Sequence, residues 1–170
     1  MVRTSLSEKK LQKALGRVKR KQARVAERYP GDSGARQPVH TVYGGAHLFA
    51  SDTATKLGQL ALRALEAHAA DADAFAEAIG MHGELAGKVY DRVREKLRRE
   101  PVEDFRIDFE DGYGTRPDAE EDACARQAAL EVAAGMKENS LPPFIGIRIK
   151  NFGPGTVDRG VRTMDVFLTA

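Results

Sequence analysis

Charged residues interrupt two apolar segments of the sequence, and they are its best candidates for chemistry. Residues 105–110 alternate apolar and charged side chains, which in a β-strand would put the charged ones on a single face. Residues 144–149 are rich in isoleucine and contain one arginine. The candidate catalytic residues at these two places are Glu110, Asp111 and Arg148. Because burying an unpaired charge is costly, these side chains should pair with one another or with a ligand.

The residue types indicate which chemistry this group could perform. Arg148 can hold a carboxylate through two parallel hydrogen bonds. Glu110 and Asp111 can orient waters around a divalent cation or bind it directly. A cation and an arginine together would stabilise an enolate that forms beside a carboxylate. An interior salt bridge between Glu110 and Arg148 without a catalytic role is the alternative interpretation.

The elements that must position these residues alternate between strands and helices. We expect strands at 39–43, ended by Gly44 and Gly45, at 105–110 and at 144–149. We expect helices from Ser51 or Asp52 to about residue 69, over 72–99 with a break near 80–83, over 117–136, and a helix starting in 164–170. This order predicts right-handed βαβ units and a parallel α/β sheet. Chemistry in such sheets gathers where strands end, so Tyr43, Gly44 and Tyr113 are predicted to contact substrate together with Arg148.

A basic segment precedes this region. Residues 1–28 carry ten Lys or Arg against two Glu, a net charge of +8, whereas residues 29–170 carry 17 against 23, a net charge of −6. We predict a helical arm over residues 1–29, starting after Ser5 or Ser7. The arm could bind phosphates, but packing on the acidic remainder or on a partner subunit is favoured, and nucleic acid is an improbable partner.

Composition limits the class of protein further. No apolar run approaches the length that crosses a bilayer, and the first ten residues are too polar for an ordinary secretory signal. The single cysteine, Cys124, cannot form an internal disulfide. We therefore expect a cytoplasmic protein that does not enter membranes.

The motif Asp108-Phe109-Glu110-Asp111-Gly112, a following helix with Arg126, and then Ile147-Arg148-Ile149-Lys150 resemble the citrate lyase β-subunit and HpcH/HpaI aldolase family. Residues 42–45 are similar to the end of the first strand in that family. The resemblance implies a (β/α)8 barrel of the phosphoenolpyruvate/pyruvate type and a Mg²⁺-dependent lyase acting on a 2-oxo acid or an acyl-CoA. It also implies that Arg148 binds the substrate carboxylate and that Glu110 and Asp111 contact the metal through water.

The sequence departs from the family in three ways. Lys150 stands where the motif asparagine is expected, residues 72–101 form a long insertion, and Gly44-Gly45 lacks the family proline. A complete barrel also takes about 250 residues. We therefore predict that residues 30–170 are the amino-terminal part of a divergent barrel, with three of its strands. Direct metal ligands would lie beyond residue 170.

Other interpretations of the same residues stay open at this stage. Barrels of the phosphoenolpyruvate/pyruvate type also perform phosphoryl transfer. A non-catalytic binding remnant is the third possibility. A homo-oligomer, or a complementing carboxyl-terminal segment, would complete the fold in each case.

Overall fold

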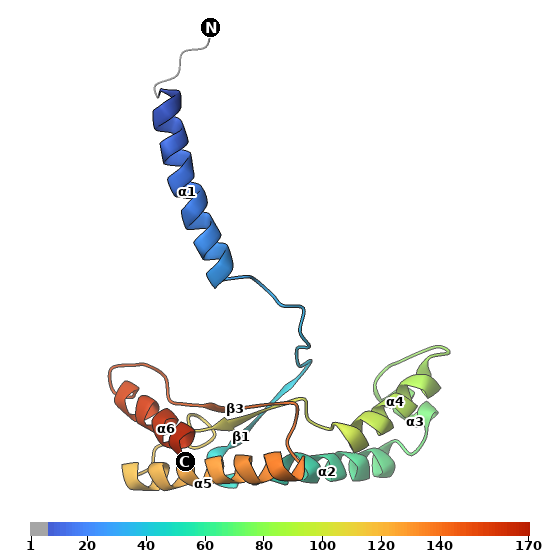
Figure 1. Ribbon diagram of the computed structural model, residues 1–170. Coiled ribbons are helices and arrows are strands. Elements are labelled where there is room, and N and C mark those ends of the chain that lie inside the picture. The colour runs from blue at the N-terminus through green and yellow to red at the C-terminus, as the bar shows by residue number, and fades with distance from the viewer. Residues whose placement is uncertain (1–6) are drawn as a thin grey trace. The chain divides into compact units, whose positions relative to one another are not determined.

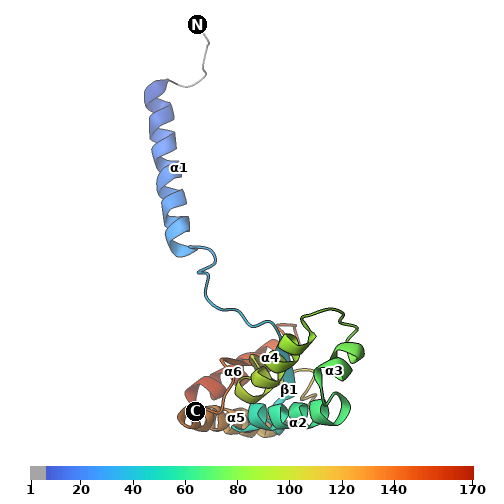
Figure 2. The same cartoon turned by 90° about the vertical axis from the view of Figure 1, so that its right-hand side faces the viewer.

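The computed structural model describes residues 7–170, which form two compact units, residues 7–37 and residues 38–170 (Figures 1 and 2). The elements are, in order, α1 (Glu8–Arg28), β1 (Thr41–Gly45), the short 3-10 helix η1 (Ala46–Leu48), α2 (Thr53–His68), α3 (Ala72–Ala78), α4 (Ala86–Arg99), β2 (Asp104–Asp108), α5 (Asp118–Glu138), β3 (Phe144–Arg148) and α6 (Val157–Thr169). None of the helices within residues 7–170 is both long and apolar enough to cross a membrane.

The first unit consists of α1 and the segment that follows it. Ser7 occupies the N-cap position of α1, while Ser5 and the rest of residues 1–6 of the predicted arm lie outside the described residues. The predicted helix is therefore present, and it buries none of its side chains.

The second unit is a two-layer α/β structure. Its three strands are parallel in the order β1-β2-β3. In Figure 1 the helices α2, α5 and α6 all lie on one face of this sheet. Phe105 and Ile107 point from the central strand into the core on that face, where they meet apolar residues of α2, α5 and α6. The opposite face of the sheet carries Arg106, Asp108 and Arg148, and no helix of residues 38–170 lies over it in Figure 1.

The parallel sheet and the separation of its two faces agree with the sequence, but three boundaries were predicted wrongly. The strand predicted at 105–110 is β2, which ends at Asp108, so Glu110 lies in the loop after the strand. The strand predicted at 39–43 is β1, which runs from Thr41 through Gly45, so Gly44 and Gly45 belong to the strand instead of ending it. Both glycines are required by close packing. A Cβ on Gly44 would lie 2.6 Å from Cζ of Phe105, and one on Gly45 would collide with the carbonyl oxygen of Gly112.

The last wrong boundary is the start of the final helix. α6 begins at Val157, whereas the sequence analysis placed the start of this helix in residues 164–170. Gly160 is the residue that is misleading, since glycine usually weakens a helix. Here it lets α6 approach β3: a Cβ at this position would lie 2.6 Å from the carbonyl oxygen of Lys150.

Candidate active site

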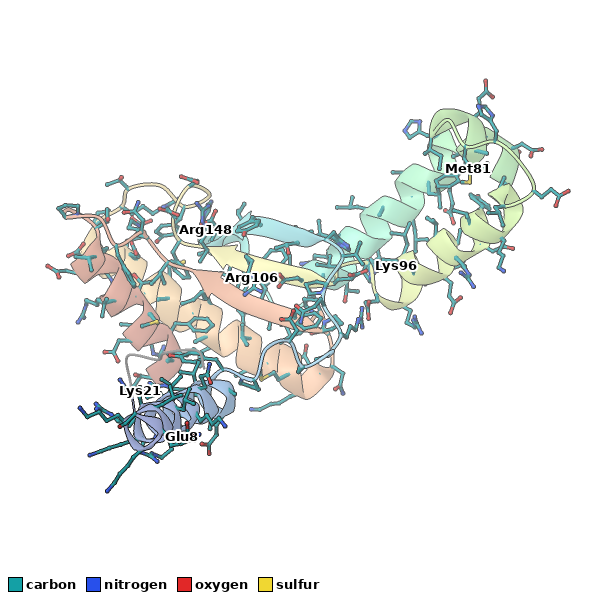
Figure 3. All side chains as sticks on the ribbon, turned by 90° about the horizontal axis from the view of Figure 1, so that it is seen from above. Glu8, Lys21, Met81, Lys96, Arg106 and Arg148 are labelled. Atoms are coloured by element: carbon teal, nitrogen blue, oxygen red, sulfur yellow. The ribbon has the colours of Figure 1, made fainter. Side chains whose placement is uncertain are left out.

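The candidate site is built on the register of β2 and β3. Asp108 and Arg148 are the last residues of these strands and lie opposite each other in the parallel ladder. Because side chains alternate along a strand, both point to the face that the helices do not cover. Figure 3 looks onto that face, with Arg148 at the carboxyl end of the strands and Arg106 farther back on the sheet.

Three carboxylates surround the guanidinium of Arg148. Nη1 lies 3.1 Å from Oδ2 of Asp108, and Nη2 lies 2.7 Å from Oε2 of Glu110 and 2.8 Å from Oδ2 of Asp111. The structure therefore brings together the three residues that the sequence singled out. Hydrogen bonding to Asp111, and then the charges of Asp108, Glu110 and Asp111, raise the pKa of Arg148 above its ordinary value.

Tyr43 completes this group from the neighbouring strand. Its ring centroid lies 5.6 Å from the guanidinium carbon of Arg148, a cation–π distance. The ring is 57% exposed, so it forms an accessible wall beside the arginine. Of the residues predicted to contact substrate, Tyr43 and Arg148 thus lie together.

Asp108 connects the strand to the loop that follows it. Its side chain is buried, and it accepts hydrogen bonds from the backbone N–H groups of Glu110 (2.8 Å) and Gly112 (3.0 Å) as well as from Arg148. These bonds fix the backbone that presents Glu110 and Asp111. Sequence reasoning placed Asp108 on the charged face but did not assign it to the site. The feature that would have identified Asp108 is the strand register, in which it lies directly opposite Arg148.

Sequence reasoning placed Asn151 in the loop after the third strand but did not assign it a role in the site. Its backbone N–H and its side-chain amide donate to Oε1 of Glu110 at 3.2 and 2.9 Å. An asparagine was expected one position earlier, where Lys150 stands. The chain reaches Glu110 with the next residue instead, after β3 has ended at Arg148.

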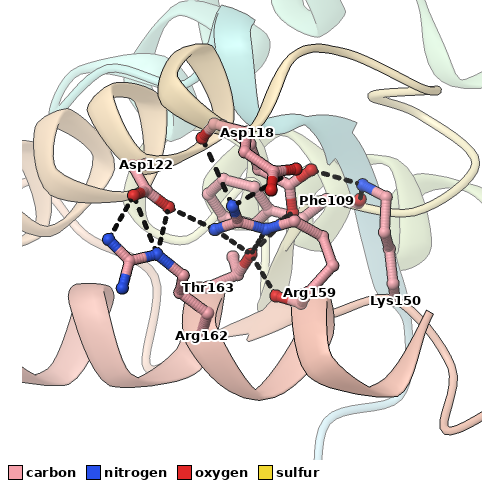
Figure 4. Close-up of polar contacts among 8 residues, drawn as sticks. Phe109, Asp118, Asp122, Lys150, Arg159, Arg162 and Thr163 are labelled. Carbon is pink, nitrogen blue, oxygen red and sulfur yellow. Dashed lines mark hydrogen bonds and ion pairs between the residues drawn. The ribbon is translucent and has the colours of Figure 1, made fainter.

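Lys150 takes part in a different, buried cluster. Its ammonium group donates to the carbonyl oxygen of Phe109 at 2.8 Å and to Oε2 of Glu121 at 2.7 Å. Glu121 is fully buried in α5 and also accepts from the hydroxyl of Thr163 at 2.6 Å. Figure 4 shows this network, in which Arg159 of α6 lies between α5 residues and Thr163. The network joins the chain just after β3 to helices α5 and α6. It therefore supports the site from the helix-covered side of the sheet.

Two predicted substrate contacts lie elsewhere. Gly44 faces Phe105, on the helix-covered side of the sheet. Tyr113 is also buried, with its ring centroid 5.6 Å from that of Phe109 and 4.6 Å from the guanidinium carbon of Arg116. Burial raises the pKa of the Tyr113 hydroxyl. Neither residue is brought to Arg148. Arg126, the helix arginine of the motif, is exposed on α5.

The oxygen atoms of the side chains around Arg148 determine how a metal ion could be held at this site. Carboxylate and amide oxygens are ligands that Mg²⁺ accepts. Within residues 7–170, however, no three His, Cys, Asp or Glu side chains are arranged to hold a metal ion. Glu110 and Asp111 both contact Arg148, and so they fit a role through bridging water better than direct coordination.

Comparison with known proteins identifies a family whose model covers most of the chain. The model of a protein family described as "Domain of unknown function (DUF6986)" matches residues 18–170. No curated protein and no solved structure matches the chain.

Proposed function

The chain belongs to the family described as Domain of unknown function (DUF6986), and from that premise we propose that it carries the arginine site of a Mg²⁺-dependent carbon–carbon lyase. Its substrate would be a 2-oxo acid or an acyl-CoA derivative. The convergence of Asp108, Glu110 and Asp111 on Arg148 carries the proposal, because it occurs at the carboxyl ends of two neighbouring parallel strands. Parallel α/β enzymes place their chemistry at that end of the strands.

The proposal includes a (β/α)8 barrel of which residues 38–170 form the first part. Three features support it: parallel strands in sequential order, helices on one face only, and charged side chains on the other face. In a closed barrel that charged face would line the interior. The remaining strands would come from a complementing carboxyl-terminal segment or from another copy of the chain.

Arg148 would bind the carboxylate of the substrate. The guanidinium already contacts three carboxylates, so one of them must give way when the substrate arrives. Asp111 is suited to this, because its side chain is 80% exposed and its carboxylate becomes hydrated when it moves away from Arg148. Asp108 stays buried and holds Nη1, which keeps the arginine aimed at the open face. Arg148 would then neutralise the negative charge that develops as the carbon–carbon bond breaks.

Glu110 and Asp111 would hold the Mg²⁺ ion through its water shell, and Asn151 would keep Glu110 in position. When bound, the ion supplies polarisation of the substrate carbonyl. Direct ligands would come from residues outside this chain.

The proposal is tested by proton exchange at the methyl group of pyruvate. Where a site stabilises negative charge beside the carbonyl, solvent water takes up a C3 proton and a deuteron from D2O replaces it, which NMR follows directly. We expect Mg²⁺-dependent exchange in the protein with its completed barrel. In the Arg148→Ala variant the exchange rate should fall on the order of 10²-fold or more. Arg126→Ala is the matched control, because Arg126 is exposed on α5. No exchange in the parent protein, or equal rates in both variants, would reject the proposal.

A further inference from the structure

Helix α1 carries an apolar seam that nothing in the described part of its unit, residues 7–37, covers. Its large apolar residues follow each other at spacings of four, three and seven, and they are Leu11, Leu15, Val18 and Val25. All four are 38–57% exposed. With Gln22 in the remaining place, they occupy alternating a and d positions of three heptads, the pattern of a coiled-coil helix.

A shallow depression on this face is largely open to solvent. It measures about 370 Å³ and is lined by Val18, Lys21, Gln22, Val25 and Ala26. The first four of these residues are spaced i, i+3, i+4 and i+7. Four residues of one helix at this spacing are those that receive a side chain of the facing helix in knobs-into-holes packing. The seam is therefore shaped for another helix.

The charges that flank the seam select the kind of helix. The e positions are Gln12, Lys19 and Ala26, and the g positions are Ala14, Lys21 and Arg28. None is acidic, and α1 as a whole carries nine Lys or Arg against two Glu. A second copy of α1 would bring the same positive charges to the flanks of the seam and could form no opposite-charge pair there.

We infer that α1 is one strand of a heterotypic coiled coil whose partner is an acidic helix with apolar a and d residues and Glu or Asp at its e and g positions. The narrow Leu and Val seam, interrupted by Gln22, fits a helix better than a lipid surface, which favours broad faces with Trp or Phe. Duplex DNA would use the lysines and arginines but not the seam. Gln22 would favour one register of the pair, as a single polar a residue does in other coiled coils.

The test uses the whole chain and a synthetic acidic heptad peptide with Val at a, Leu at d, Glu at e and g, and Asn opposite Gln22. Calorimetry is expected to show one-to-one binding, circular dichroism a gain of helix, and high salt a weakening of the affinity. Val18→Asn alters the seam, and Ala23→Asn places the same residue at an outward b position. We expect the Kd to rise on the order of tenfold or more for Val18→Asn and to change little for Ala23→Asn.

A second matched pair tests the flanking charges. Lys19→Glu with Lys21→Glu reverses an e and a g position, and Lys13→Glu with Arg20→Glu makes the same charge change at two outward f positions. The first double variant should no longer bind the peptide, and the second should bind it as the parent protein does. The inference would be overturned by no binding to the peptide, by equal losses within each matched pair, or by stronger binding to phosphatidylserine vesicles or duplex DNA. Self-association through α1 that the peptide does not displace would overturn it in favour of a second copy.

Discussion

Asp108 and Arg148 face each other across β2 and β3 as the last residues of two neighbouring parallel strands, with Nη1 and Oδ2 3.1 Å apart. The two side chains differ in exposure: that of Asp108 is 4% exposed and that of Arg148 35%. The carboxylate is thus the fixed partner, held by two backbone N–H groups, and the guanidinium reaches outward from it to Glu110 and Asp111. Disturbing Asp108 should therefore disturb the loop and the arginine together.

Asp108→Asn should destabilise the protein by about 1–3 kcal/mol, because it weakens buried hydrogen bonds to Arg148 and to two backbone groups. Asp111→Asn should change the free energy of unfolding by less than about 0.5 kcal/mol, since exposed ion pairs contribute little. Urea unfolding of both variants measures the difference. Equal effects would show that Asp108 does not anchor the loop.

The alternation of residues 105–110 was enough to predict both faces of β2, because the period of a strand is a local property. The strand register was not predictable in the same way, since it depends on partners far along the chain. This is why Asp108 was not paired with Arg148 in advance, although the alternation placed both on the charged face. Glu110 lies beyond the end of β2 and still reaches Arg148 through the turn of the loop.

Side chains that change direction after a strand were the hardest to predict. Continued alternation would put Lys150 beside Arg148, but the strand ends first and Lys150 binds Glu121 instead. The acidic first turn of α5 fits the positive end of a helix dipole, and nothing in its sequence marks Glu121 as the fully buried member. Tyr113 is equally ambiguous, because a tyrosine after a strand can line a site or pack below it.

Gly45→Ala should displace the loop at residues 110–114, because the new methyl group would collide with the carbonyl oxygen of Gly112. We expect a loss of stability of about 1–3 kcal/mol, together with weaker pyruvate exchange in the intact protein. Gly87→Ala is the control, since Gly87 lies in the first turn of α4 and a Cβ there meets nothing within 4 Å. That substitution should not destabilise the protein, and it should raise the stability by no more than about 0.5 kcal/mol. A tolerated alanine at position 45 would show that the loop does not depend on this close approach.

Glu103 should make the protein sensitive to acid. A hydrogen bond from Lys96 (2.5 Å), followed by the backbone N–H of Val39, lowers the pKa of Glu103 from 4.5 to about 2. Because the folded-state pKa lies below the unfolded one, the stabilisation is present above pH 4.5 and disappears as the pH falls toward 2. Glu103→Gln should therefore flatten the fall of stability in that range.

The measurement is the midpoint of urea unfolding at a series of pH values. Glu95→Gln on α4 is the control, because Glu95 is exposed. A pH profile of Glu103→Gln with the same slope as the parent below pH 4.5 would contradict the assignment of this acid-sensitive contact.

Glu121→Ala should be the most damaging of these substitutions. Glu121 is fully buried, and its removal leaves the ammonium group of Lys150 without its carboxylate partner, whereas Arg159 keeps its ion pair with Asp122. Breaking a buried ion pair by deleting one partner costs about 3–5 kcal/mol, because the remaining charge is uncompensated. The neighbouring Glu120→Ala removes only a surface pair with Arg116, which is worth about 0.3–0.5 kcal/mol. Both substitutions remove one carboxylate. Comparing the thermal and urea unfolding of the two variants therefore distinguishes the effect of losing a buried charge from the effect of losing an exposed one. Similar losses in both would mean that the network of α5, α6 and Lys150 does not hold the end of β3 in place.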